Sequence, residues 1–163
     1  DHASEGPQLF VSTAEVGGTA HWLDHAPLLS WGELRSLAGA GVSIGSHARR
    51  HRRLAGLARQ ELDGELLGSR DDLVHEVAIT PVAVAYPHGE HDADVRAASA
   101  DSGYRVGFTT EKGRNAAGTD VYRLARVSVH AADGRLAVLW KALTGEALPP
   151  LWLRIRRLRG GSV

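Results

Sequence analysis

Cysteine and methionine are both absent from the 163 residues of this chain. The lack of cysteine excludes a disulfide framework, a thiolate metal site and a cysteine nucleophile, so any transition-metal site must use nitrogen and oxygen ligands. The lack of methionine means that the chain does not begin at its translational start, and we expect further sequence before Asp1. Because a leader would lie there, the absence of a signal peptide from these residues says nothing about the compartment.

An excess of charge of either sign is also lacking, since 19 lysines and arginines balance 19 aspartates and glutamates. This composition predicts no polyanion-binding surface, and we therefore expect no nucleic-acid partner. No stretch reaches the roughly 18 consecutive apolar residues of a membrane-spanning helix. The length and the 43% content of hydrophobic residues are typical of one folded domain with a substantial core.

Apolar runs typical of strands alternate along the chain with amphipathic segments typical of helices. We expect strands over residues 8–13, 42–44, 82–86, 104–109 and 124–129, and helices that start at Ser30 and Asp92 or cover 58–77 and 134–144. This alternation predicts an α/β fold with a mainly parallel sheet, either open or closed into an incomplete barrel. In both arrangements the loops at the carboxyl ends of the strands form the functional site.

Three of the expected helices carry local signals. Ser30-Trp31-Gly32-Glu33 has the pattern of a capping box, in which a hydroxyl and a carboxylate each bind a backbone amide at the helix start. The helix over 58–77 has an apolar stripe that we expect to be buried, namely Leu62, Leu66, Leu73 and Val77. Its charged residues are expected to form a solvated surface, namely Glu61, Asp63, Glu65, Arg70 and Asp71. The apolar face of the last helix consists of Leu136, Leu139, Trp140 and Leu143.

His47 and His51 lie four residues apart in the stretch after the expected strand over 42–44. Neutral imidazoles are good ligands for divalent transition-metal ions, and a catalytic zinc commonly has three protein ligands and one open position. The position of the pair, after a buried strand and before the apolar anchor Leu54, favours a metal site. With nine histidines in the chain, this spacing also arises by chance, so a solvated or structural pair is the alternative.

Three further residues are candidates for a functional site. His88 follows the expected strand over 82–86, and His130 follows the expected strand over 124–129. Trp22 lies on a loop before the first helix, where it either lines a binding surface or covers the edge of the core.

Taken in order, these features resemble the NodB-type polysaccharide deacetylases, carbohydrate esterase family 4. The resemblance covers about residues 9–129. It rests on Gly17-Gly18, Leu29-Ser30-Trp31, Gly45-Ser46-His47 with His51 and Leu54, Ala85-Tyr86-Pro87-His88-Gly89, Gly103-Tyr104 and Tyr122-Arg123-Leu124. It implies a distorted, incomplete (β/α) barrel.

The resemblance implies hydrolysis of N- or O-acetyl groups from sugars, commonly polymers of N-acetylglucosamine, with the help of a divalent ion. In this family the ion is usually zinc, held by two histidines and an aspartate, and His47 and His51 match the two histidines. The ion activates a water that attacks the acetyl carbonyl. We therefore expect a metal site at this pair, with zinc as the best-fitting metal.

The resemblance also implies roles for other residues. His88 matches the residue whose backbone amide stabilises the oxyanion formed on the acetyl group. His130 stands where many relatives have the histidine that protonates the departing amine, although a surface histidine is the alternative. Tyr86, Pro87 and Trp22 are expected to contact the sugar.

The chain departs from the family pattern in three places. The signature Thr-Phe-Asp-Asp-Gly, which supplies the general base and the aspartate ligand, does not occur in these residues. We expect it on a strand upstream of residue 1, with a helix between, so that the chain as given is catalytically incomplete. Asp71-Asp72 is no substitute because it lies inside an expected helix. Ala48 and Ala85 replace a hydroxyl residue and an arginine that are common in relatives.

These observations together predict a bacterial metal-dependent hydrolase that removes acetyl groups from a sugar or polysaccharide, with residues 1–148 as its deacetylase-like domain. The alternatives are a non-catalytic carbohydrate-binding relative and a deacetylase of small-molecule amides. The basic amphipathic tail over 149–163 covers its own domain or contacts a membrane surface, and we do not favour the membrane. The expected partner is a carbohydrate, and an extracellular or cell-envelope location is slightly favoured over the cytoplasm.

Overall fold

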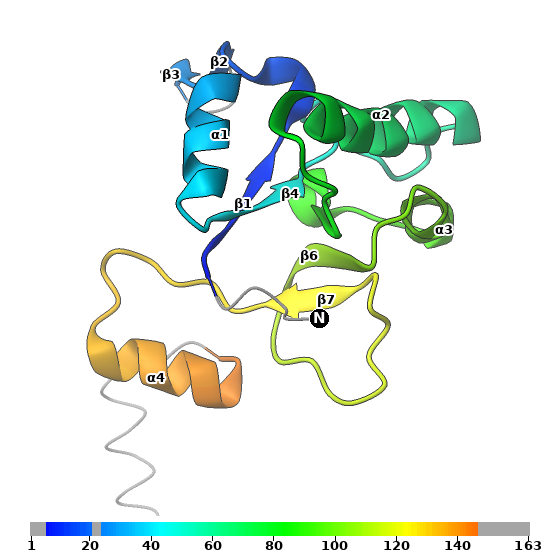
Figure 1. The fold of residues 1–163 in the computed structure, drawn as a ribbon. Coiled ribbons are helices and arrows are strands. Elements are labelled where there is room, and N and C mark those ends of the chain that lie inside the picture. Colours follow the sequence, from blue (N-terminus) through cyan, green and yellow to red (C-terminus); the bar gives the residue numbers. More distant parts are fainter. Residues whose placement is uncertain (1–5, 21–23, 147–163) are drawn as a thin grey trace, which may run out of the picture.

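The computed structural model of the chain describes residues 6–20 and 24–146 (Figure 1). Five strands form one sheet in the order β1-β4-β5-β6-β7, and they are β1 (Gln8–Val11), β4 (Ser43–Ser46), β5 (Ala83–Ala85), β6 (Val106–Lys112) and β7 (Leu124–Arg126). The helices are α1 (Trp31–Gly39), α2 (Arg59–Val77), α3 (Ala93–Asp101) and α4 (Arg135–Thr144). Two short 3-10 helices, η1 (Thr13–Glu15) and η2 (Pro87–Gly89), follow β1 and β5, and β2 (Thr19–Ala20) pairs with β3 (Ala26–Pro27).

Every neighbouring pair of strands in the five-stranded sheet is parallel. The predicted α/β fold with a parallel sheet is therefore confirmed. Within the described residues, β1 and β7 are the edge strands. Because the strands are parallel, their carboxyl ends all lie at one edge of the sheet, where the turns after β1, β4 and β5 meet. None of the described helices is long and apolar enough to cross a membrane.

The predicted helix starts are also confirmed. The Ser30 hydroxyl accepts a hydrogen bond from the Glu33 amide at 3.3 Å, and a Glu33 carboxylate oxygen accepts one from the Ser30 amide at 2.8 Å. At the start of α3, the Asp92 side chain accepts a hydrogen bond from the Val95 amide at 2.9 Å. Side-chain oxygens thus bind amides that have no partner within their own helix.

The core lies where α2 packs on the sheet and on its neighbouring helices. Leu62, Leu66 and Leu73 of α2 have no exposed surface, which confirms the predicted stripe. Burial of each such side chain contributes about 1.5–3 kcal/mol to stability. The first half of α2 packs with β5 and α3, and its second half packs with α1, β1 and β4.

Two sequence-based expectations were wrong in part, and the last helix adds an observation that the sequence did not address. Glu65 is not on a solvated surface, because only 1% of the residue is exposed. The strand expected to reach Val129 ends at Arg126, because the residues beyond it turn away to carry α4 and do not pair with β6. The apolar face of α4 is largely exposed within the described structure, and α4 lies apart from the other helices (Figure 1). Its exposed leucines are Leu136, Leu139 and Leu143.

Candidate active site

His47 and His51 lie at the two ends of one turn at the carboxyl edge of the sheet. His47 directly follows β4, and its amide donates a hydrogen bond to the Val11 carbonyl of β1 at 2.8 Å. Leu54, three residues after His51, is completely buried and fixes the far end of the turn in the core, as the sequence predicted. The turn is therefore held by the sheet at one side and by the core at the other.

The His47 imidazole has a defined tautomer. Its Nδ1 lies 2.6 Å from the Ala85 carbonyl oxygen, which can only accept a hydrogen bond. We therefore assign the proton to Nδ1, which leaves the lone pair of Nε2 available to a ligand. In many metal sites the ring nitrogen that does not bind the ion donates a hydrogen bond to a carbonyl or carboxylate, and this bond orients the histidine.

The His47 imidazole is also held in its neutral form. Burial lowers its pKa to about 4, although the hydrogen bond to Ala85 acts in the opposite direction. Charges on His51 and Arg126 lower the pKa further. A neutral imidazole can donate its lone pair to a metal ion without first losing a proton.

Three imidazole rings form a row. The ring centroids of His47 and His51 are 5.0 Å apart with an interplanar angle of 51°. The centroids of His51 and His88 are 4.7 Å apart with an angle of 54°. The structure thus brings together three of the four histidines that the sequence singled out.

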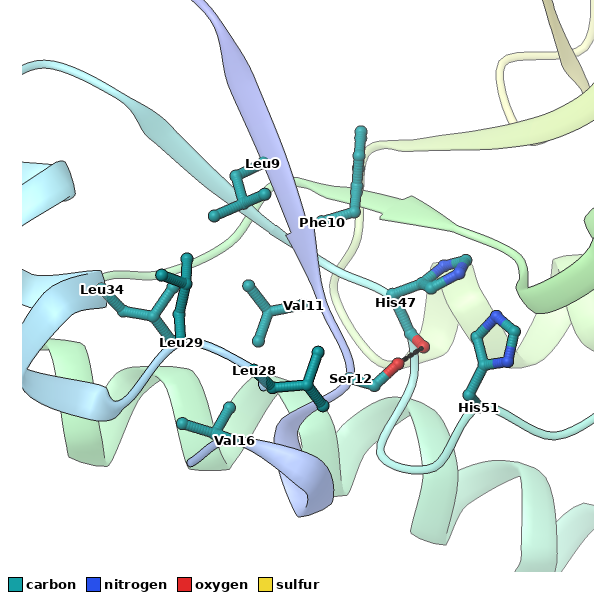
Figure 2. Close-up of a pocket in the computed structure, with 10 residues that line it drawn as sticks. All are labelled: Leu9, Phe10, Val11, Ser12, Val16, Leu28, Leu29, Leu34, His47 and His51. Carbon is teal, nitrogen blue, oxygen red and sulfur yellow. Dashed lines mark hydrogen bonds between the residues drawn. The ribbon is translucent and has the colours of Figure 1, made fainter. Parts of the chain in front are cut away.

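A pocket of about 250 Å³ adjoins the first two histidines (Figure 2). Figure 2 shows His47 and His51 at one end of this pocket and aliphatic side chains at the other, among them Leu9, Val11 and Leu34. The pocket runs along β1, which pairs only with β4 among the described strands. One end of the pocket therefore offers imidazole nitrogens that can bind a ligand, and the other end offers apolar surface.

The donor set fits two ligand positions of a divalent ion. Two neutral imidazole nitrogens suit zinc and similar ions. Glu15 lies beside the backbone of His51, since its Oε1 accepts a hydrogen bond from the His51 amide at 3.4 Å. Its Oε2 is buried without a hydrogen-bond partner in the described structure. Within residues 6–20 and 24–146, no group of three histidine, aspartate or glutamate side chains is placed to hold a metal ion.

The position of His88 depends on a tight turn in η2. His88 has a φ of 58°, in the left-handed region, and Gly89 follows with a φ of 75°. A Cβ atom at Gly89 would lie only 2.1 Å from the Thr110 hydroxyl oxygen, so glycine is required there. The Thr110 hydroxyl in turn donates a hydrogen bond to the His88 carbonyl at 3.3 Å. The close approach of η2 to β6 leaves the His88 side chain exposed beside His51.

The expected sugar contacts of Tyr86 and Pro87 require correction. Tyr86 has no exposed surface, and its hydroxyl donates a hydrogen bond to the Tyr122 carbonyl at 3.0 Å. Pro87 is also buried. Both side chains are buried in this conformation, and Tyr86 is part of the core cluster. Trp22 lies outside the described residues.

His130 lies apart from the row of imidazoles. It is exposed and stands four residues past the end of β7, where its amide donates a hydrogen bond to an Asp133 carboxylate oxygen at 2.7 Å. Lys141 of α4 donates to the same carboxylate at 2.5 Å. The ring contacts that join His47, His51 and His88 do not include His130. Its catalytic role stays a prediction.

Two residues near the site were missed from the sequence. Arg126 of β7 lies close enough to lower the pKa of His47, and its Nε donates a hydrogen bond to the Thr109 carbonyl at 2.8 Å. Glu65 binds the backbone of the histidine turn from α2. A signal for Glu65 was present, because it lies three residues after Leu62 and directly before Leu66, on the apolar stripe of the helix.

Comparison with known proteins agrees with this fold. The family model described as polysaccharide deacetylase matches residues 9–107. YxkH of Bacillus subtilis strain 168, whose name assigns it to the polysaccharide deacetylases, is 30% identical over 110 residues, which are 66% of this chain and 38% of YxkH. The chain thus spans well under two thirds of this relative.

Solved structures share the fold. The Streptococcus pyogenes deacetylase PplD in complex with acetate matches with a TM-score of 0.73 and 21% identity, over 82% of this chain and 57% of that chain. BC0361, a polysaccharide deacetylase from Bacillus cereus, matches with a TM-score of 0.66 and 22% identity, over 82% of this chain and 41% of that chain. At this level of identity the likeness is one of fold alone. Since the family match covers more than half of its residues, the chain belongs to the polysaccharide deacetylase family of the NodB type.

Proposed function

We propose that this chain forms the histidine-bearing part of a metal-dependent deacetylase that acts on an N-acetylated sugar or polysaccharide. The observation that carries the proposal is the state of His47, whose Nδ1 binds the Ala85 carbonyl while burial keeps the ring neutral. This leaves Nε2 available beside the His51 ring. The family supports the class of reaction, and the proximity of the two rings supports their role as ligands.

His47 and His51 would hold a divalent ion, and zinc suits two imidazole donors best. When bound, such an ion polarises a water molecule and the acetyl carbonyl, so that hydrolysis proceeds near neutral pH. The Ala85 carbonyl keeps the His47 ring in one orientation during the reaction. The remaining protein ligand is expected to be the aspartate of the Asp-Asp-Gly signature, which these 163 residues do not contain.

Deacetylation also requires a proton at the departing nitrogen. Water adds to the acetyl carbon, the carbon–nitrogen bond breaks, and the amine leaves with one added proton. His88 is an exposed imidazole whose ring lies 4.7 Å from that of His51, and histidine is the side chain that most often transfers protons in enzymes. We therefore assign the proton donor to His88 before His130.

The test measures acetate release from N-acetylglucosamine oligomers by the full-length protein with zinc supplied. His47→Gln and His51→Gln should reduce release to the level of the metal-free protein. His75→Gln is the matched control, because His75 is a histidine on α2 whose side chain is 85% exposed. His88→Gln should lower kcat more than His130→Gln, because only His88 adjoins the pair.

Each other outcome identifies a different function. Oligomer binding without acetate release would support a carbohydrate-binding protein. Release from small acetylated amides but not from oligomers would support a small-molecule deacetylase. Full activity of His47→Gln would overturn the role of the pair.

A further inference from the structure

We propose that Glu65 of α2 is a positioning residue, whose carboxylate sets the geometry of the turn that joins His47 and His51. The inference rests on the proposed function for the purpose of the turn, which is to present both imidazoles to one ion. The contacts that support it are formed within the chain and do not require a metal ion.

The Glu65 carboxylate binds two successive backbone amides of the turn. Its Oε2 accepts hydrogen bonds from the Arg50 amide at 2.8 Å and from the Arg49 amide at 3.2 Å. Ala48, directly before them, has a φ of 60° in the left-handed region. A left-handed residue next to such amides forms a concave backbone site that favours an anion. Here the anion is a side chain of the protein itself.

The cost of burying the Glu65 carboxylate is offset mainly by its hydrogen bonds to the turn. Only 2% of the Glu65 side chain is exposed, and a buried carboxylate is costly unless hydrogen bonds compensate for lost water. The Arg50 guanidinium approaches Glu65 Oε1 at 3.3 Å, but this arginine side chain is 62% exposed, so the ion pair contributes little. The compensation therefore comes from the two amides, which are fixed in place by it.

Two further residues on the same face of α2 bind the histidine turn or the strand residue directly before it. Ser69, four residues after Glu65, lies 2.8 Å from the Ser46 hydroxyl, and both serines are completely buried. Asp72, three residues later, accepts a hydrogen bond from Arg49 Nε at 3.1 Å. Spacings of four and three residues place all three side chains on one face of α2. The helix therefore binds the end of β4 through Ser69 and the histidine turn through Glu65 and Asp72.

The turn determines where the second histidine lies. His47 is bound by Val11 and Ala85, and His51 lies four residues further on, where its amide binds Glu15. The turn is also bound from η1, whose Thr13 and Ala14 amides donate hydrogen bonds to the Ala48 and Arg49 carbonyls. If the amides of Arg49 and Arg50 were released, one of these two supports would be lost, and the 5.0 Å separation of the two rings would be held less firmly. An ion bound by both imidazoles would then have to order the turn on binding, and its affinity would fall.

The test compares the protein with Glu65→Gln and Glu65→Asp. Glutamine keeps the shape but loses the charge, and aspartate keeps the charge but is one methylene too short to reach the amides. Asp71→Asn is the matched control, since it removes an exposed carboxylate from the same helix. The first measurement, without metal, is hydrogen exchange at the amides of residues 49 and 50. The second is the affinity for Co²⁺ alone, by chelator competition, with the visible absorption of the bound ion as a report of its geometry.

Both Glu65 variants should exchange these two amides faster and bind Co²⁺ about 10–100-fold more weakly, as is common when a partner behind a metal ligand is removed. The control should match the wild-type protein in both. Unchanged exchange in Glu65→Gln, or faster exchange with unchanged cobalt affinity and absorption, would overturn the inference. If the wild-type protein binds no cobalt while Glu65→Gln still exchanges faster, the proposed function fails and Glu65 is reduced to an anchor of a loop.

Discussion

His47 shows how one residue can combine two opposing influences. Burial lowers its pKa from 6.5 to about 4, and the Ala85 carbonyl only partly offsets this effect. In an unfolded chain the same imidazole keeps its ordinary pKa. Between these two values the unfolded chain binds more protons than the folded protein does. The stability that His47 contributes is therefore complete above pH 6.5 and is lost as the pH falls towards 4.

We expect the free energy of unfolding of the metal-free protein to fall by up to about 3 kcal/mol between pH 7 and pH 4 through His47. Urea denaturation in the presence of a chelator, at several pH values across this range, measures the effect. His47→Gln should flatten this part of the profile, whereas His75→Gln should leave it unchanged. A profile that is the same for His47→Gln and the wild-type protein would contradict the prediction.

Ala48 is a second residue at which the backbone decides what is tolerated. It has a φ of 60° and no exposed surface, between the two histidines. We expect Ala48→Val to destabilise the protein by about 2–4 kcal/mol, because a β-branched side chain disfavours the left-handed region and overfills the core. The matched control is Ala55→Val, at an exposed position, which should change stability by less than about 0.5 kcal/mol. Thermal and urea denaturation of both variants would measure the difference.

At the scale of helices and strands, local signals were read correctly where they are strong. The capping box at Ser30, the cap at Asp92 and the leucine stripe of α2 each reflect contacts within one helix or one helix face. The end of β7 could not be found in this way, because it depends on pairing with β6 and not on the alternating pattern that continues to Val129. Strand ends are set by partners that a local pattern does not contain.

The site residues likewise fall into those that a local sequence pattern indicates and those that depend on distant partners. His47 and His51 could be predicted because they are close in sequence and follow a strand. Glu65 could not be assigned a role, because its partners lie 15 and 16 residues away and it binds their backbone, which carries no residue-specific signal. The left-handed conformation of Ala48 was equally hidden, since alanine gives no sign of it.

Two glycines allow a matched test of helix and turn. Gly64 lies inside α2, and a Cβ added there would meet no atom within 4 Å. We expect Gly64→Ala to stabilise the protein by about 0.5–1 kcal/mol, since alanine loses less backbone freedom in a helix. Gly89→Ala should instead destabilise it and displace His88, because the added Cβ would overlap Thr110. Opposite shifts in Tm are the expected result, and shifts of the same sign would contradict it.

At the scale of the whole molecule, the sheet gathers the site from distant parts of the chain. Turns after β1, β4 and β5 bring Glu15, His51 and His88 to one edge, although His51 and His88 are 37 residues apart in the sequence. This assembly followed from the predicted alternation of strands and helices. The exposed leucines of α4 did not, because a periodic pattern shows which face is apolar but not what covers it.

The ligand set yields a prediction for the chain as a unit. These 163 residues contain two of the expected protein ligands and no Asp-Asp-Gly sequence. We expect them alone to bind zinc at least about 10-fold more weakly than the full-length protein, because a third ligand and its charge are missing. Competition with a chromophoric chelator measures both affinities. Equal affinities would show that the two histidines, with water, already make the complete site.

The hydrogen bond from His47 Nδ1 to the Ala85 carbonyl links a side chain directly after β4 to the backbone of β5. Any sliding of β5 against β4, which are in register at Ser46 and Val84, would lengthen that bond and alter the electron density at the ring nitrogen. The chemical shift of a ¹⁵N label in this imidazole would therefore change when the two strands move relative to each other. Its resonance would report movement between β4 and β5 while the protein is still folded.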